Sequence, residues 1–344
     1  MSQVIHGKGE TAQTLAELYS PIREELGQVE EILRKELTSN HPFVDRLVKH
    51  GFRLGGKRLR PALVLLAGKA CGEICNDHLM LAAAMELIHT ATLIHDDVLD
   101  EASMRRHLDT VNARWDNEAS ILLGDYLLAR AIGLVGAVDT TYACEVIGNA
   151  SREMCEGELR QIGARGDYNL KEEEYMEIIG DKTAALCACC CQVGAHYAGA
   201  SEEAQQSLAR YGRHLGLAFQ VVDDVLDVSG DEATMGKSLG TDLVKKKATL
   251  PLIRLLGTAN DADRAELMGI LSSSDNPNSG KHSSGSHGQE ALNPWFEKYD
   301  AIEYSRQKAV ELTHLAAAEL DTLTQGPIVD TLRRLAEFVV SRRQ

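Results

Sequence analysis

Two triplets of aspartate, far apart in the chain, are the residues whose types and spacing point most directly to chemistry. The first lies in LIHDDVLDEASMRR and comprises Asp96, Asp97 and Asp100. The second repeats the Asp-Asp-x-x-Asp spacing in FQVVDDVLDVSGD and comprises Asp223, Asp224 and Asp227. Residues four apart share one face of a helix, so each triplet would gather its carboxylates within about one turn.

These carboxylates predict a metal site. Three of them on one helical turn repel one another, and both triplets lie within apolar segments, where an unpaired charge is costly. A hard divalent cation is the natural compensation, and Mg²⁺ fits because it accepts one or two carboxylates together with the phosphate oxygens of a substrate. The alternative, a solvated helix end, would account for one copy but not readily for two.

The sequence also supplies cations for an anionic substrate. Lys57 and Arg60 occur in GGKRLRP, and Arg105 and Arg106 follow the first triplet. Further candidates are Lys182, Lys237 and Lys247. The planar guanidinium group matches phosphate oxygens in a bidentate manner, so these residues favour a diphosphate ligand. A surface salt bridge is the alternative for the arginine pair, and such bridges contribute little to stability.

A histidine shares the face of the first triplet. His89 precedes Asp96 by two helical turns, so that His89, Thr92, Asp96 and Asp100 would form one stripe. A single histidine is more often structural than functional, but this one faces the predicted site. In the second triplet Gln220 precedes Asp224 by one turn on the same stripe.

The elements that must position these residues read as helices. Apolar residues recur at helical spacing between Thr14 and Leu37, with Ser20-Pro21 able to start a fresh helix. The segment between Glu73 and Leu123 has neither glycine nor proline and predicts two long buried helices. Asn169 is expected to cap a helix that continues to about Tyr197. Because no apolar and polar alternation is sustained, the predicted fold class is all-α.

Length and composition predict one domain. The 344 residues, 44% of them hydrophobic, can bury a large core, and a single domain over 1–344 is expected.

The segment 272–293 is rich in Ser, Gly, Asn and His and predicts a mobile loop. His282 and His287 in that loop make a poor metal site. The net charge of −15, without a long basic patch, argues against a nucleic-acid partner.

The chain is expected to be cytoplasmic. Its first residues lack the pattern of a signal peptide, and no apolar run was expected to approach the roughly 20 residues that span a bilayer. The clustered cysteines Cys187, Cys189, Cys190 and Cys191 lack the spacing of disulfide frameworks or zinc sites. They are interpreted as reduced core residues.

Taken in order, GGKRLRP, DDVLDEASMRR, GDYLLARA, DKTAAL, FQVVDDVLD, GKSLGTDL and KKKATLP resemble the trans-polyprenyl diphosphate synthase family. The match runs from about Gly51 to Pro251. The resemblance implies a single bundle of antiparallel helices around a central cavity, with the two aspartate motifs facing each other across its mouth. It also implies a homodimer.

The resemblance assigns roles residue by residue. Mg²⁺ would be held by Asp96, Asp97, Asp100, Asp223, Asp224 and Asp227. The allylic diphosphate would be held by Arg105, Lys182, Thr183, Gln220, Lys237 and Lys247. Isopentenyl diphosphate would be held by Lys57, Arg60, His89 and Arg106. The residues expected to act in catalysis are Asp96, Asp100, Arg105, Lys182, Asp223 and Lys237.

The reaction implied is a head-to-tail trans condensation of isopentenyl diphosphate with an allylic diphosphate. Metal ions and fixed cations would meet the charge that develops on the leaving diphosphate. The carbocation would add to the alkene, and the departing diphosphate would take the proton. One departure from the family pattern is His107, which stands where glycine often follows the arginine pair.

Product length is expected to depend on the residues before the first triplet. Bulky aromatic residues there close the cavity in short-chain relatives, whereas this chain has Ala91 and Thr92. A long-chain product, such as an octaprenyl or heptaprenyl diphosphate, is therefore predicted, with transient membrane contact for its release. The alternatives are a geranylgeranyl or farnesyl diphosphate synthase and a non-catalytic subunit of a heteromeric synthase.

Two further alternatives fit the sequence less well. A class I terpene cyclase normally carries an Asn/Ser/Glu pattern as its second metal motif, whereas this chain has a second aspartate triplet. A carboxylate-bridged di-iron bundle would need Glu-x-x-His pairs projecting into its core, and none is convincingly placed.

Overall fold

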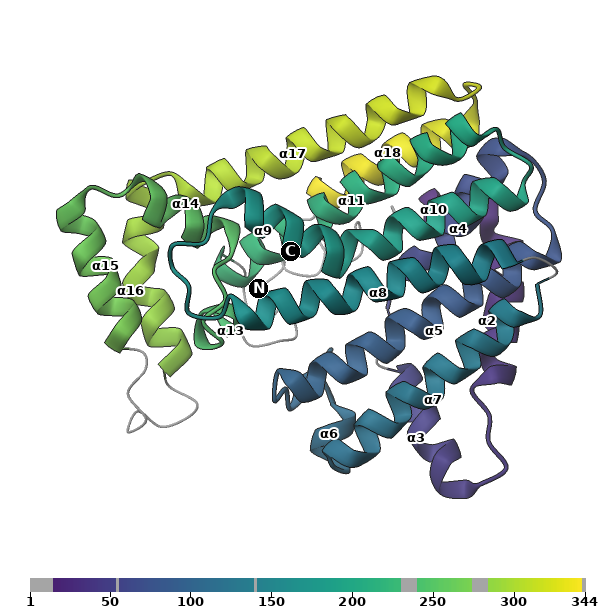
Figure 1. Cartoon of the computed structure of the whole chain (residues 1–344), viewed down its shortest axis with the longest axis horizontal. Coiled ribbons are helices and arrows are strands. Elements are labelled where there is room, and N and C mark those ends of the chain that lie inside the picture. Colours follow the sequence, from purple (N-terminus) through teal and green to yellow (C-terminus); the bar gives the residue numbers. More distant parts are fainter. Residues whose placement is uncertain (1–14, 54–55, 139–140, 230–239, 274–283, 342–344) are drawn as a thin grey trace, which may run out of the picture. The chain divides into compact units, whose positions relative to one another are not determined.

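The computed structural model describes residues 15–53, 56–138, 141–229, 240–273 and 284–341 (Figure 1). The chain divides into two compact units. Unit 1 comprises 1–151, 186–213 and 316–335, and unit 2 comprises 152–185, 214–315 and 336–344. The described part of both is helical apart from one hairpin of two-residue strands, so the predicted all-α class is confirmed.

Unit 1 holds the N-terminal elements. These are η1 (Ser20–Ile22), α2 (Arg23–Glu36), α3 (Pro42–Arg53), α4 (Leu59–Cys71), α5 (Asn76–Leu99), β1 (Met104–Arg105), β2 (Leu108–Asp109), α6 (Val111–Arg114) and α7 (Asn117–Gly136). It also takes the start of α8 (Thr141–Gly163), most of α10 (Ala185–Tyr197), the start of α11 (Glu202–Ser229), η3 (Leu320–Thr322) and much of α18 (Pro327–Ser341).

Helix α5 lies at the centre of unit 1. It packs against α7, α4 and α2, drawn in purple to teal in Figure 1. Ala82, Ala83, Met85 and Leu87 are almost fully buried, because this helix is apolar around most of its circumference. Of the two long helices expected between Glu73 and Leu123, only α5 lies within that segment. The hairpin and α6 follow it, and α7 begins at Asn117 but continues to Gly136.

Small residues let helices approach closely around α10. A side chain at Gly194 would meet the Val64 carbonyl oxygen at 2.3 Å, and one at Gly212 would meet the Cys187 carbonyl oxygen at 2.4 Å. The clustered cysteines are all buried and free of disulfides. Burial raises the pKa of the Cys190 and Cys191 thiols. The prediction that they are reduced core residues agrees with this packing.

Unit 2 holds the remaining elements. They are the end of α8, α9 (Glu172–Ile179), the π-helical segment η2 (Gly180–Ala184), the end of α11, α13 (Thr241–Val244), α14 (Leu250–Thr258), α15 (Asp261–Ser273), α16 (Ser284–Lys298) and most of α17 (Ala301–Glu319). Leu255 and Leu267 form a core with Leu292 and Phe296 of α16.

Two local predictions need correction. The segment 272–293 is helical from Ser284 onward, because Leu292 and Phe296, one turn apart, bury in the core despite their polar surroundings. Residues 274–283, with His282, lie outside the described residues, as does the side chain of His287. The helix expected after Asn169 begins at Glu172 with Lys171 at its N-cap, and no side chain caps it.

The expectation about apolar length was wrong. By length and mean hydropathy, Asn117–Gly136 and Glu172–Tyr197 could each cross a bilayer. The second stretch is 72% buried, as expected of a core helix, whereas Asn117–Gly136 is only 39% buried. Helix α7 therefore presents an apolar face.

Candidate active site

The first aspartate triplet lies at the C-terminal end of α5. Asp96 and Asp97 are in its last turn, and Asp100 is its C-cap, with an N–H that donates to the Asp96 carbonyl at 2.8 Å. His89, Thr92, Asp96 and Asp100 are all partly exposed, and so are Leu93, His95, Val98 and Leu99 at the same end of the helix. The stripe predicted from their spacing is therefore an accessible face.

The middle carboxylate of this triplet is already occupied. Asp97 is 2% exposed, and the Arg105 guanidinium binds it with Nε to Oδ1 at 2.9 Å and Nη2 to Oδ1 at 2.8 Å. Such a paired contact fixes both side chains. Asp97 thus anchors Arg105, whereas Asp96 and Asp100 occupy the accessible stripe.

The arginine pair lies on the hairpin of β1 and β2, where Arg105 pairs with Leu108. Arg106 and His107 form the two-residue turn with φ values of 52° and 62°. Positive φ at both positions is what a type I′ hairpin requires, and glycine adopts it at the lowest cost. This geometry explains why glycine suits the position of His107.

Gly56 in GGKRLRP makes room for the second arginine. A side chain at Gly56 would lie 2.3 Å from Nη2 of Arg106, so the guanidinium rests against the glycine backbone. This contact joins two segments that the sequence predicted to bind one diphosphate. Lys57, the next residue, is exposed.

His89 lies among these arginines. Burial, with the charges of Arg60, Arg105, Arg106 and Arg58, holds the pKa of His89 well below its usual value. The imidazole is therefore neutral near pH 7. Unit 1 thus gathers the predicted residues Arg60, His89, Arg105 and Arg106 into one cationic cluster, with a neutral ring that could donate to an anion.

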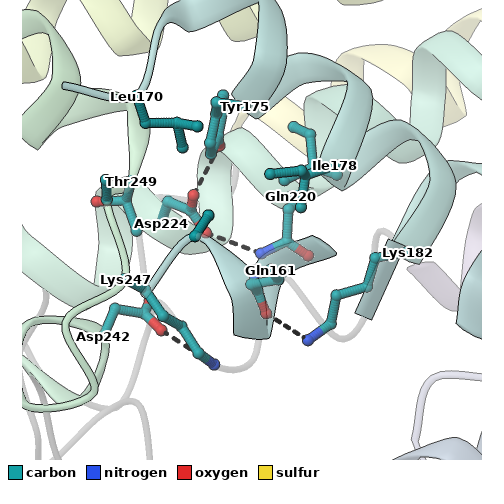
Figure 2. Close-up of a pocket in the computed structure, with 13 residues that line it drawn as sticks. Gln161, Leu170, Tyr175, Ile178, Lys182, Gln220, Asp224, Asp242, Lys247 and Thr249 are labelled. Carbon is teal, nitrogen blue, oxygen red and sulfur yellow. Dashed lines mark hydrogen bonds and ion pairs between the residues drawn. The ribbon is translucent and has the colours of Figure 1, made fainter. Parts of the chain in front are cut away.

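The second triplet shows the same division. Asp224 on α11 is buried, and its carboxylate accepts from the Tyr175 hydroxyl at 2.6 Å and from Nε2 of Gln220 at 2.8 Å, as Figure 2 shows. Burial and the charge of Asp242 raise the pKa of Asp224 to about 8. The first aspartate, Asp223, is partly exposed.

Asp227 is a structural ligand of its own chain. It is 1% exposed, accepts from the Thr241 hydroxyl at 3.1 Å, and accepts from the Asp242 N–H at 3.3 Å. Its carboxylate therefore binds the N-terminal end of α13. Asp97, Asp224 and Asp227 are thus buried and bound by protein donors, whereas Asp96, Asp100 and Asp223 are partly exposed.

Lys182 and Thr183 lie on the π-helical turn between α9 and α10. The turn passes close to α8, since a side chain at Gly157 would lie 2.4 Å from the Lys182 nitrogen. Nζ of Lys182 donates to Gln161 at 2.8 Å and pairs with Glu158. The Thr183 hydroxyl donates to Gln220 at 3.0 Å. Such π turns are frequent at functional sites.

Lys182 and its partner Gln161 line one pocket of unit 2 together with Asp224 (Figure 2). Of the predicted site residues it contains Lys182, Gln220, Asp224 and Lys247. Tyr175, Gln161 and Asp242 also line it and were not predicted. Nζ of Lys247 lies 3.7 Å from Oδ1 of Asp242. The acidic first turn of α9 marked a helix start but gave no sign that Tyr175 reaches Asp224, 49 residues away.

Lys237 lies outside the described residues.

Of the predicted chain-length residues, Ala91 is 0% exposed, and Thr92 is partly exposed with its hydroxyl donating to the His89 carbonyl at 2.8 Å. Thr92 therefore lies on the accessible stripe and Ala91 in the core behind it.

The donor set fits Mg²⁺. Among the described residues, no three His, Cys, Asp or Glu side chains form a ready-made metal site. Mg²⁺ does not need one, since it is commonly held by one or two carboxylates together with substrate phosphates and water. Asp96 and Asp100, four residues apart on one face, supply such a pair.

Comparison with known proteins gives a consistent result. The sequence pattern of the Polyprenyl synthetase family matches residues 41–284. Octaprenyl diphosphate synthase of Escherichia coli (strain K12) is 35% identical over 324 residues, which is 93% of this chain and 96% of that protein.

Two solved structures are similar over nearly their whole length. A decaprenyl diphosphate synthase from Rhodobacter capsulatus matches with a TM-score of 0.87 and 36% identity, covering 96% of this chain and 99% of that one. A polyprenyl synthase from Caulobacter crescentus CB15, complexed with calcium and isoprenyl diphosphate, matches with a TM-score of 0.88 and 33% identity, covering 96% and 98%.

The resemblance drawn from GGKRLRP and the two aspartate motifs is confirmed by these matches. The second aspartate triplet, which set the chain apart from a terpene cyclase, falls within the matched range. The chain belongs to the polyprenyl synthetase family, and is a trans-prenyltransferase with the all-α isoprenoid synthase fold.

Proposed function

We propose that this enzyme condenses isopentenyl diphosphate with an allylic diphosphate, head to tail and in the trans configuration, to make a long-chain polyprenyl diphosphate. One observation carries the proposal. In each aspartate triplet the first carboxylate is partly exposed, and the second is buried and bound by protein donors. Such an arrangement presents fixed, accessible carboxylates for a cation.

Mg²⁺ would be held by Asp96 and Asp100 in unit 1 and by Asp223 in unit 2, and the allylic diphosphate would supply further oxygen ligands. When bound, it would supply positive charge that stabilises the leaving diphosphate. Arg105 is oriented by Asp97, and Lys182 by Gln161 and Glu158, so both cations are preorganised before substrate binds. Asp97 would position Arg105, Asp224 would position Tyr175 and Gln220, and Asp227 would hold the N-terminal end of α13. The metal roles that the resemblance implies for these three residues stay predictions.

Isopentenyl diphosphate would bind the cationic cluster of unit 1. Arg60 and Arg106 would pair with its oxygens, and the neutral His89 would donate one hydrogen bond. Its diphosphate would hold the alkene for attack on the allylic carbon, so that proximity replaces a bimolecular encounter. The proton released would pass to the departing diphosphate.

Several features support a long product. The small residues Ala91 and Thr92 precede the first triplet, and the relatives above are an octaprenyl and a decaprenyl diphosphate synthase.

The test is chromatography of products made from radiolabelled isopentenyl diphosphate with geranyl, farnesyl or geranylgeranyl diphosphate as primer. Products of about 35 carbons or more are expected, which is the length of heptaprenyl and octaprenyl chains. Termination at farnesyl or geranylgeranyl diphosphate would favour the short-chain alternative. The absence of any product would favour the alternative of a non-catalytic subunit.

We also propose a homodimer formed through α7. Ile121, Leu122 and Ile132 lie on one face of this helix, and Ile132 is 72% exposed. Exposed apolar faces of this kind mark protein interfaces, and the family resemblance implies a second copy as occupant. Sedimentation of Ile132→Asp should give a monomer, whereas Val310→Asp on α17 should remain a dimer. A monomeric wild type would refute the proposal.

A cytoplasmic location is part of the same proposal. Both substrates are charged, whereas the product carries a long apolar chain that must pass to a membrane. Fractionation should therefore find the enzyme in the soluble fraction, with a portion released from membranes by salt. Recovery only after detergent extraction would contradict this.

A further inference from the structure

Behind the cationic cluster lies an arginine that the predicted site does not include. Arg58 is the N-cap of α4 and has a left-handed φ of 54°. Its Nε donates to Glu30 of α2, and its Nη1 donates to Glu86 of α5 at 2.7 Å. The guanidinium also lies 4.4 Å from the centre of the Phe52 ring. Three helices thus hold the segment between Lys57 and Arg60.

Three buried polar atoms beside this arginine have no hydrogen-bond partner in the part of the chain that the structure describes. They are the Tyr19 hydroxyl, Nε of Arg60 and Oε2 of Glu86. Glu86 is 1% exposed. Buried polar atoms are nearly always paired in native proteins, so three in one region need an explanation.

The three atoms are close enough to influence one another. Burial and the charge of Glu86 raise the pKa of Tyr19, and the charge of Arg60 opposes this. The hydroxyl therefore keeps its proton. The region then offers two donors and one acceptor, a set that one water molecule would satisfy by accepting from Tyr19 and Arg60 and donating to Glu86.

We propose that Glu86 and Tyr19 are positioning residues, which fix Arg60 through one bridging water molecule. The inference rests on the proposed function, because it takes the outer nitrogens of Arg60 as ligands of isopentenyl diphosphate. Glu86 would have two roles, because its Oε1 accepts from Arg58 and its Oε2 would accept from the water molecule. With Nε fixed, the guanidinium loses little rotamer entropy when the diphosphate binds.

The expected effect is confined to one substrate. Arg60 would contact the diphosphate of isopentenyl diphosphate and not the allylic one, so a loosened Arg60 raises one KM alone. Tyr19→Phe removes the hydroxyl and keeps the ring. Glu86→Gln keeps the shape, leaves an acceptor for the water, and removes the charge that holds Arg58.

The experiment is steady-state kinetics with each diphosphate varied in turn, together with the thermal midpoint. Tyr19→Phe should raise the KM for isopentenyl diphosphate about fivefold to tenfold, the equivalent of one hydrogen bond. The value of kcat and the KM for the allylic diphosphate should stay within about twofold. Glu86→Gln should shift the same KM. Asp321→Asn, which breaks an exposed ion pair with Arg333 in the same unit, is the matched control and should change none of them.

A double-mutant cycle separates positioning from general stability. Arg60→Lys lacks Nε, so adding Tyr19→Phe to it should raise the KM by less than about twofold further. Additive effects, an unchanged KM in Tyr19→Phe, or an equal loss for both substrates would overturn the inference while leaving the proposed function intact. If Glu86→Gln fails to fold, Tyr19→Phe and the cycle still decide. A wild type without prenyltransferase activity would instead refute the proposed function.

Discussion

The aspartates of one motif have different neighbours, and this difference separates stability from catalysis. Asp97 is buried against Arg105, whereas Asp96 is partly exposed one residue earlier. Removing one partner of a buried ion pair leaves the other charge uncompensated. The same motif therefore contains residues whose loss should be detected by different assays.

The first prediction compares two neighbouring substitutions. Asp97→Ala should lower the free energy of unfolding by about 2 kcal/mol, since Arg105 is partly solvated and the cost falls below that of a fully buried pair. Asp96→Ala should change it by less than about 0.5 kcal/mol, because the Asp96 side chain is partly exposed and substitutions at such positions usually cost little. Chemical denaturation measures both, and equal destabilisation by the two would contradict the assignment.

The second prediction concerns pH. The pKa of His89 is depressed in the folded protein, so the unfolded chain takes up a proton below its ordinary value of 6.5 while the folded chain does not. Stability should therefore fall as the pH drops from about 7 toward 5.5, at no more than about 1.4 kcal/mol per pH unit for this group.

His89→Asn removes that contribution. Urea unfolding at several pH values should show a shallower loss of stability for the variant below pH 6.5 than for the wild type. Between pH 7.5 and 9 the difference between the two proteins should be constant, which serves as the internal control. A parallel decline in both proteins below pH 6.5 would show that His89 is protonated in the folded state.

The third prediction concerns product length. Ala91→Phe and Thr92→Phe should each shorten the product, because a ring beside the accessible stripe would block the growing chain. Ala91 is fully buried, so its substitution should also cost about 1–3 kcal/mol through overpacking. Thr92 lies on the stripe and should cost less. Chromatography of the products gives the answer, and an unchanged distribution in both variants would refute the length gate.

At the scale of elements, two short irregular segments carry three of the predicted cations, Arg105, Arg106 and Lys182. The hairpin turn places Arg106 against Gly56, and the π turn places Lys182 beside Gln161. The cost of these backbone conformations is met by the helices that flank them. Regular helices alone would not put these side chains at the same places.

The fourth prediction tests the turn. His107→Gly should raise the free energy of unfolding by about 0.5–1 kcal/mol, because glycine adopts positive φ without strain. Met104→Gly, in the adjoining strand, gains no such relief and should be neutral or destabilising. Thermal melting compares them, and destabilisation by His107→Gly would show that the histidine side chain itself holds the loop.

At the scale of the whole molecule, the sequence predicted the features that depend on regular spacing or on residues close together in the chain. Helical spacing placed Asp96 and Asp100 on one face, and an apolar segment free of glycine and proline predicted α5. The helicity of Ser284–Lys298 was missed, because two buried residues, Leu292 and Phe296, suffice to hold a segment whose average composition is polar.

Contacts between distant residues could not be predicted. Tyr175 and Asp224 are 49 positions apart, and Glu30 and Arg58 meet only when α2 packs beside α4. In the sequence the three aspartates of each triplet could not be told apart. Only the fold shows that Asp97, Asp224 and Asp227 are buried and bound by donors of the protein itself. The single-domain prediction over 1–344 stays a prediction, as the chain forms two compact units.

The central claim is that the accessible carboxylates of each motif bind Mg²⁺ for the ionisation of the allylic diphosphate. The direct test is Mg²⁺-dependent turnover of radiolabelled isopentenyl diphosphate by Asp96→Ala and Asp223→Ala, with circular dichroism to verify the fold. Each variant should lose at least about a hundredfold in kcat and remain helical. Near-normal turnover by either folded variant, or undiminished wild-type turnover after chelation of Mg²⁺, would contradict the account.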